Sequence, residues 1–323
     1  MKTRCLIVIA CTFAAALTVN AQNRKETLKV VITQNDYSAI SDVTYQQYGN
    51  RRMKMHILIP NDGKKEHPAI VYFPGGGFIS ANIDSYLDWR IALCKAGFVV
   101  ASAEYRCVPD RYPALVADGK AAVRFLRAHA GEYRIDARSI GVLGDSAGGY
   151  VAAMIGMTNG DKRLDMGDNL GISSDVQAAA TIYGITNLLN IGEGHGEEIE
   201  KIHLQPNVTE ALLINGYAFF THAGGAVDKD KKYALECSPI GRIDQENNSL
   251  NTSNGKIPPF LIMHGNNDGL VSQKQSDRFY NALAENDCKA DYIVLDGAGH
   301  GDPMWHQQTV IDRVVEWFRE NLK

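Results

Sequence analysis

The chain has 323 residues, a length that suits a single α/β domain, and hydrophobic residues make up 45% of it. Its 33 basic and 37 acidic residues leave a formal net charge of −4 at pH 7. No run of lysine and arginine stands out, which argues against nucleic acid or an anionic membrane surface as a partner.

The first 21 residues have the three parts of a secretory signal peptide. MKTR is a positively charged start, CLIVIACTFAAALTV is an apolar stretch, and the small residues up to Ala21 predict cleavage after that position. We therefore expect a secreted or periplasmic protein. Two alternatives stay open: a membrane anchor, which needs about 20 apolar residues, and a lipid anchor on Cys11, which ends the lipobox-like VIAC.

Residues 22–323 are expected to form one domain, in which short β-rich runs alternate with helical patterns. This alternation predicts an α/β fold with a mostly parallel central sheet and helices on both of its faces. An opening hairpin is expected at the sheet edge, over 43–48 and 53–60. Six further strands lack strict alternation, as expected of strands buried on both faces: 69–73, 98–105, 139–144, 178–183, 259–264 and 291–296.

Helical periodicity and one irregular segment complete the pattern. Apolar residues recur on one face over 118–130 and over 310–322, which predicts two helices. Residues 187–255 break the alternation of strands and helices. Because loops this long in compact domains are usually functional or disordered, we expect a partly helical insertion here that acts as a cap over a pocket.

The stretch SIGVLGDSAGGYVAA, residues 139–153, holds one serine among small residues. Gly144 to Gly148 match G-x-S-x-G between a predicted strand and a predicted helix, the setting in which this motif forms a nucleophile elbow. Such a turn brings its two outer positions against the backbone, so both must be glycine. We predict that Ser146 is a nucleophile at the carboxyl end of its strand; an ordinary glycine-rich turn is the alternative.

A serine hydroxyl needs a general base, and the base needs a partner that fixes its tautomer. Asp268, in HGNNDGLVS, and His300, in DGAGHGD, each follow a predicted strand, where open α/β sheets gather their sites. Their order along the chain after Ser146 is the order in which the partners of such an elbow occur. Other histidines fit less well, because His264 ends a strand and His306 opens the last helix.

The third requirement is a set of donors for the oxyanion. YFPGGGF, residues 72–78, follows a predicted strand, and its three glycines free the backbone to turn N–H groups inward. With the amide of Ala147, such a loop stabilises a tetrahedral intermediate. A plain tight turn is the alternative. Pro74 has no N–H to donate, so which glycine amides face the pocket stays open.

Together these segments resemble an α/β-hydrolase of the esterase/lipase type. The resemblance is to hormone-sensitive-lipase-like and bacterial feruloyl/acetyl-xylan esterase-like enzymes. It rests on FPGGGF, AEYR (103–106), YPALVADGKAAVRFLRAHA (112–130), GDSAGGY and the two downstream loops. It covers about 43–322 and is weakest in 187–255; the family commonly has histidine where this chain has Pro74. The resemblance implies a nucleophile, a general base, an orienting acid and oxyanion donors: Ser146, His300, Asp268, and Gly76, Gly77 and Ala147.

The expected function is a secreted serine carboxylic-ester hydrolase that works through an acyl-enzyme and needs no metal or cofactor. Export and the resemblance favour short-chain or carbohydrate-linked esters, such as acetyl or feruloyl esters. The alternatives are a lipase or peptidase of the same fold and a hydrolase-fold protein that only binds its ligand. Phe78 and Trp305 are candidates for lining the substrate pocket, with plain packing as the alternative.

Four cysteines follow the predicted signal peptide: Cys94, Cys107, Cys237 and Cys288. No CxxC spacing occurs, which argues against structural zinc or a dithiol redox site. In an oxidising compartment these residues could form disulfides, and burial as small hydrophobic residues is the alternative.

Overall fold

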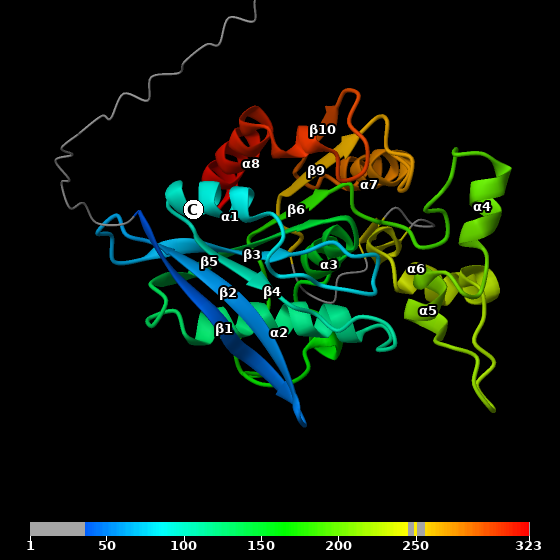
Figure 1. Ribbon diagram of the computed structural model, residues 1–323, viewed down its shortest axis with the longest axis horizontal. Helices are drawn as coiled ribbons and strands as arrows, with labels where there is room; N and C mark the ends of the chain where they lie inside the picture. The colour runs from blue at the N-terminus through cyan, green and yellow to red at the C-terminus, as the bar shows by residue number, and fades with distance from the viewer. Residues whose placement is uncertain (1–35, 245–248, 251–255, 323) are drawn as a thin grey trace, which may run out of the picture. The chain divides into compact units, whose positions relative to one another are not determined.

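A mixed eight-stranded sheet forms the centre of the fold, with the strand order β1-β2-β4-β3-β5-β6-β9-β10 (Figure 1). The computed structural model describes residues 36–244, 249–250 and 256–322. The predicted signal peptide and Cys11 lie outside these described residues. The sheet confirms the predicted fold class, and each sequence-predicted strand overlaps an observed one.

The first two strands form the predicted hairpin at one edge of the sheet. β1 (Tyr37–Tyr48) pairs antiparallel with β2 (Arg51–Pro60), which pairs antiparallel with β4 (Val99–Ala103). All further pairs of this eight-stranded sheet are parallel, and the carboxyl ends of these strands therefore meet at one edge of the sheet. The strands in these pairs are β4, β3 (His67–Phe73), β5 (Ile135–Asp145), β6 (Ala178–Ile182), β9 (Phe260–Gly265) and β10 (Ala290–Leu295).

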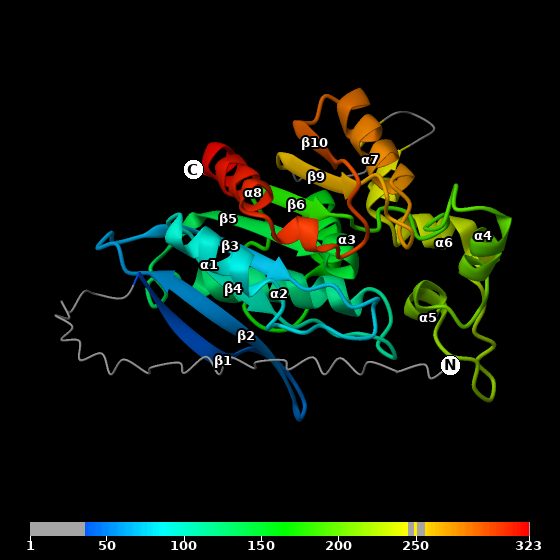
Figure 2. The same cartoon turned by 45° about the horizontal axis from the view of Figure 1, so that its top comes forward.

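Helices cover both faces of the sheet, as the sequence predicts (Figure 2). On one face, α1 (Leu87–Lys95) and α8 (Gln308–Asn321) bury Trp89 and Phe318 against strand residues. The other face carries α2 (Ala114–Ala128), α3 (Ser146–Met157) and α7 (Lys274–Glu285). Because β4 and β6 are buried along their whole length, neither strand has the polar alternation of a half-exposed one.

The segment between β6 and β9 is partly helical, as expected for residues 187–255. It lies on the side to which the arrowheads of β4 and β9 point (Figure 2). Hydrogen bonds from Tyr112 N to Leu213 O, at 2.8 Å, and from Tyr150 Oη to Cys237 O, at 2.5 Å, attach it to the rest of the fold. Its described elements are α4 (Glu197–His203), α5 (Thr209–Asn215), η2 (Val227–Asp230), α6 (Lys231–Glu236), η3 (Pro239–Arg242), β7 (Ile243–Asp244) and β8 (Ser249–Leu250).

The four cysteines among the described residues are free thiols. Cys94, Cys107 and Cys237 are buried and Cys288 is half-buried, which favours their role as small hydrophobic residues. Within the described ranges, no helix is long and apolar enough to span a membrane. The same ranges contain no group of three or more His, Cys, Asp or Glu side chains arranged to hold a metal ion.

Candidate active site

Three loops at the carboxyl edge of the parallel strands bring Ser146, Asp268 and His300 together. Ser146 follows β5, Asp268 follows β9, and His300 follows β10. Ser146 Oγ lies 2.8 Å from His300 Nε2, and His300 Nδ1 lies 2.7 Å from Asp268 Oδ2. Residues 154 and 32 positions apart along the chain are thus joined by two hydrogen bonds. The structure thus brings the three predicted site residues together, and their catalytic roles stay a prediction.

The turn that carries Ser146 has no room for side chains at its two flanking glycines. A Cβ atom on Gly144 would lie 2.1 Å from Gly148 O, and one on Gly148 would lie 2.0 Å from Phe73 O. Ser146 itself has φ 51°, a left-handed conformation that few non-glycine residues adopt. The glycine requirement predicted for this elbow is therefore confirmed, and the serine hydroxyl leaves the strand in a fixed direction.

Asp268 is held as a carboxylate by a set of donors around it. Its Oδ1 accepts hydrogen bonds from Leu270 N and Val271 N, both at 2.9 Å, and His264 Nε2 lies 3.3 Å from Oδ2. Burial alone would raise the pKa of Asp268, but the contacts with His264 and His300 hold that pKa well below its ordinary value. Asp268 is consequently ionised wherever the protein is folded at ordinary pH.

Asp145, which precedes the serine, is a site residue that the sequence reasoning missed. Its Oδ1 accepts hydrogen bonds from Tyr72 Oη at 2.7 Å and from Gly75 N at 2.9 Å. Burial raises the pKa of Asp145, and the hydrogen bonds from Tyr72 and Gly75 oppose that rise. The only available signal was its place inside G-x-S-x-G. Its carboxylate ties the glycine loop to the serine turn.

The glycine loop after β3 has the backbone freedom predicted for an oxyanion hole. Gly76 has φ 148° and Gly77 has φ 58°, conformations that favour glycine. Among the described residues, the amides of Gly76 and Gly77 donate to no other group. Ala147 lies in the first turn of α3, where amides lack an intrahelical acceptor. The role of these three amides as oxyanion donors stays a prediction.

The two aromatic candidates for the substrate pocket are packed inside the protein. Phe78 is 2% exposed and meets Tyr150 edge to face, with ring centroids 5.3 Å apart. Trp305 is fully buried, and its Nε1 donates to Gly299 O at 2.9 Å. These contacts favour the packing alternative for both rings. Trp305 braces the loop of His300 from within.

The strand order, the glycine-flanked serine turn and the relay of Ser146, His300 and Asp268 define an α/β-hydrolase of the esterase/lipase type. The chain belongs to the BD-FAE family, whose model matches residues 55–283. This match includes the serine turn and Asp268 and ends before His300, which the structure joins to the other two by hydrogen bonds.

Three similar proteins show how far the likeness extends. A truncated carbohydrate esterase from gut microbiota has a TM-score of 0.74 and 25% identity, covering 90% of this chain and 98% of that one. A bifunctional GH43-CE from Bacteroides eggerthii has a TM-score of 0.71 and 27% identity, covering 88% and 38%. Esterase LipC from Mycobacterium tuberculosis is 27% identical over 241 residues, 73% of this chain and 53% of LipC. The chain spans about half the length of the curated relatives it matches.

Proposed function

We propose that this protein is a serine carboxylic-ester hydrolase that works through an acyl-enzyme. The observation that carries the proposal is the unbroken relay from Asp268 through His300 to Ser146, with hydrogen bonds of 2.7 and 2.8 Å. The esterase names of its relatives support an ester as the bond that is cleaved. The buried donors around Asp268 support the charge that such a relay needs.

The tautomer of the neutral His300 ring follows from its two neighbours. Ionised Asp268 can only accept a hydrogen bond, so Nδ1 of His300 carries a proton and donates it to the carboxylate. Nε2 of the neutral ring is then an acceptor, and Ser146 Oγ donates to it. The hydroxyl is therefore oriented toward a base before any substrate arrives.

Acylation begins when Ser146 Oγ attacks the ester carbonyl carbon and His300 Nε2 takes the hydroxyl proton. The carbonyl oxygen becomes an oxyanion, which the amides of Ala147 and of the glycine loop would stabilise. Collapse of this intermediate breaks the bond to the alcohol, and His300 gives its proton to the leaving oxygen. In deacylation a water molecule repeats the sequence, so that acid and free Ser146 result.

Replacing Ser146 by alanine should abolish both hydrolysis and covalent labelling. By analogy with other serine hydrolases, we expect kcat to fall by about 10⁶-fold. A fluorophosphonate probe should label the native protein and leave the Ser146→Ala variant unlabelled. Ser173→Ala is a matched control, because this exposed serine lies before β6, away from the strand ends that carry the site. Equal labelling of both variants, or no labelling of the native protein, would contradict the proposal.

We also propose that the natural substrate is a short-chain or carbohydrate-linked ester and that the protein is exported to meet it. The name of the gut-microbiota carbohydrate esterase supports the substrate class, and the signal-like first 21 residues support export. The helical segment between β6 and β9, on the side of the strand carboxyl ends, supports a cap over the site.

A panel of esters tests the substrate proposal. We expect kcat/KM for acetyl esters to exceed that for octanoyl esters by about 10-fold or more. Long chains need apolar surface on which to bury their methylene groups, and the nearby Phe78 and Trp305 rings are already buried. Release of acetate from acetylated xylan would identify a carbohydrate as the alcohol part of the substrate. Release of ferulate from feruloyl esters would identify ferulate as its acyl part. Faster hydrolysis of octanoyl esters would instead favour the lipase alternative.

A further inference from the structure

Tyr183 packs against the imidazole of His300, whose two ring nitrogens are bonded to Ser146 and Asp268. It is the residue that follows β6, and it is 1% exposed. Its ring centroid lies 4.6 Å from that of His300 and 4.9 Å from that of Trp305. The tyrosine ring therefore fills the space between the imidazole and the tryptophan that braces the histidine loop.

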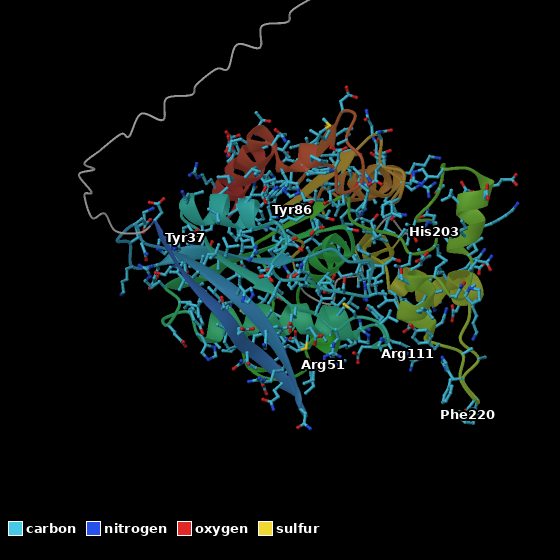
Figure 3. All side chains as sticks on the ribbon, viewed as in Figure 1. Tyr37, Arg51, Tyr86, Arg111, His203 and Phe220 are labelled. Atoms are coloured by element: carbon cyan, nitrogen blue, oxygen red, sulfur yellow. The ribbon has the colours of Figure 1, made fainter. Side chains whose placement is uncertain are left out.

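The hydroxyl of Tyr183 is tied to a second tyrosine from a distant part of the chain. Tyr86, labelled beside one end of α1 in Figure 3, forms a hydrogen bond through its hydroxyl with the hydroxyl of Tyr183. The Tyr86 ring is itself fixed by Trp89, 5.4 Å away, and by His306, 4.7 Å away. Tyr183 is thus held at its ring and at its hydroxyl.

Both tyrosines adopt backbone conformations that bulky residues rarely take. Tyr86 has φ 54° and Tyr183 has φ 38°, in the left-handed region where Ser146 also lies. Backbone strain of this kind persists only where many surrounding contacts hold the residue in place, and it is common at functional sites. In this protein the two strained residues place their hydroxyl groups in contact with each other, next to His300.

We propose that Tyr183 is a positioning residue for His300, tethered by Tyr86, and that its ring also stabilises the imidazolium formed during each chemical step. This inference rests on the proposed ester hydrolysis. His300 is bonded to Ser146 through Nε2 and to Asp268 through Nδ1. These two hydrogen bonds hold the two ring nitrogens but leave the ring free to tilt about the line that joins them. The Tyr183 ring supplies the missing lateral contact.

The chemical benefit arises when His300 becomes positively charged. The face of an aromatic ring carries negative charge density and attracts a cation close to it. Asp268 and the buried Asp145 are the carboxylates that act on the same imidazole. Because the imidazolium exists only after Ser146 has given up its proton, the Tyr183 ring favours that state over the ground state, and its loss should lower kcat more than it raises KM.

Steady-state kinetics with p-nitrophenyl acetate on Tyr183→Leu, Tyr183→Phe and Tyr86→Phe test this inference. In Tyr183→Leu we expect kcat to fall about 10-fold while KM changes less than about 2-fold. Tyr183→Phe keeps the ring but loses the hydroxyl that Tyr86 holds, so its kcat should lie only about 3-fold below that of the native protein. Tyr86→Phe, which removes one oxygen atom from the tether, should lower kcat about 3-fold.

Tyr280→Leu is the control, because Tyr280 lies on α7 and pairs with Tyr292 at 5.6 Å. Unchanged kcat in Tyr183→Leu, or an equal loss of kcat in the control, would overturn the inference. If Tyr183→Leu does not fold, Tyr86→Phe decides: unchanged kcat then overturns it. A native protein that neither hydrolyses the ester nor takes the fluorophosphonate label would instead refute the proposed function.

Discussion

His264 is a buried histidine whose hydrogen bonds support the acid of the relay. Its Nε2 lies 3.0 Å from Val271 O, which can only accept, so Nε2 carries the proton. Its Nδ1 then accepts from Ser276 Oγ, 2.7 Å away. The protonated Nε2 also faces Asp268 Oδ2 at 3.3 Å. The sequence reasoning set His264 aside because it ends a strand, yet that position places it beside the loop of Asp268.

Replacing His264 by leucine should weaken both the fold and the relay. Ser276 and Val271 would lose a buried partner each, which costs about 1–3 kcal/mol of unfolding free energy. Asp268 would lose the contact that most lowers its pKa. A carboxylate whose pKa is lower in the folded than in the unfolded protein stabilises the fold fully at pH values above its unfolded pKa of about 4. That stabilisation is lost as pH falls through the folded pKa.

Urea unfolding of the native protein and His264→Leu between about pH 2 and about pH 7 checks this prediction. The stability difference should be largest near pH 7 and should shrink once pH falls below the folded pKa of Asp268 in the variant, because below that pKa only the native protein still gains stability from the ionised carboxylate. Ser276→Ala is the control, because it removes only the partner of Nδ1 and leaves Asp268 its donors. A difference that stays constant across the pH range would show that His264 does not act on Asp268.

At the scale of elements, α2 and the nucleophile helix α3 meet through a buried lysine. Lys120 of α2 is fully buried, and its Nζ donates to Thr158 O, at the C-terminal end of α3, at 2.8 Å. Asp165 Oδ1 is the nearest carboxylate atom, at 3.9 Å. The ammonium group thus faces the negative end of the α3 dipole. Burial nonetheless lowers the pKa of Lys120 to about 8, although Asp165 opposes the shift.

The stability of the native protein relative to Lys120→Met should therefore rise as pH increases from about 8 to about 10. In that window an unfolded lysine, with a pKa of about 10.4, still holds its proton, whereas the folded one has begun to lose it. Stability increases with pH wherever the unfolded chain binds more protons. Chemical unfolding at three pH values measures the difference, and a difference that falls or stays flat would contradict the prediction.

The insertion is the set of elements that sequence reasoning described least. Its helices α4, α5 and α6 have seven, seven and six residues, too short for a clear periodic pattern. The loop after α5 leaves Phe219 and Phe220 71% and 93% exposed, and Figure 3 shows Phe220 at the far end of this segment. By contrast, the predicted start of α2 is only four residues late, although its first turn after Pro113 is also apolar and buried.

For the molecule as a whole, the sheet and the relay could be read from sequence because both depend on local signals. Strands buried on both faces appear as apolar runs, and the polar residues that follow such runs meet at one edge. Asp145, Tyr72 and Tyr183 carried no comparable signal. Their roles depend on contacts across more than 70 residues of chain, such as Tyr72 to Asp145, which no spacing rule describes. The buried position of Trp305 likewise follows from packing against Tyr183.

The position of β10 has a consequence for how activity can be used as a measurement. β10 is one of the two edge strands, pairs only with β9, and leads directly into the loop of His300. A molecule with every other strand in place but β10 detached would retain the serine turn and lack its base. Ester hydrolysis would then report only the molecules in which β10 has paired with β9. The rate at which activity returns after dilution from denaturant should therefore follow the completion of the sheet rather than the early collapse of the chain.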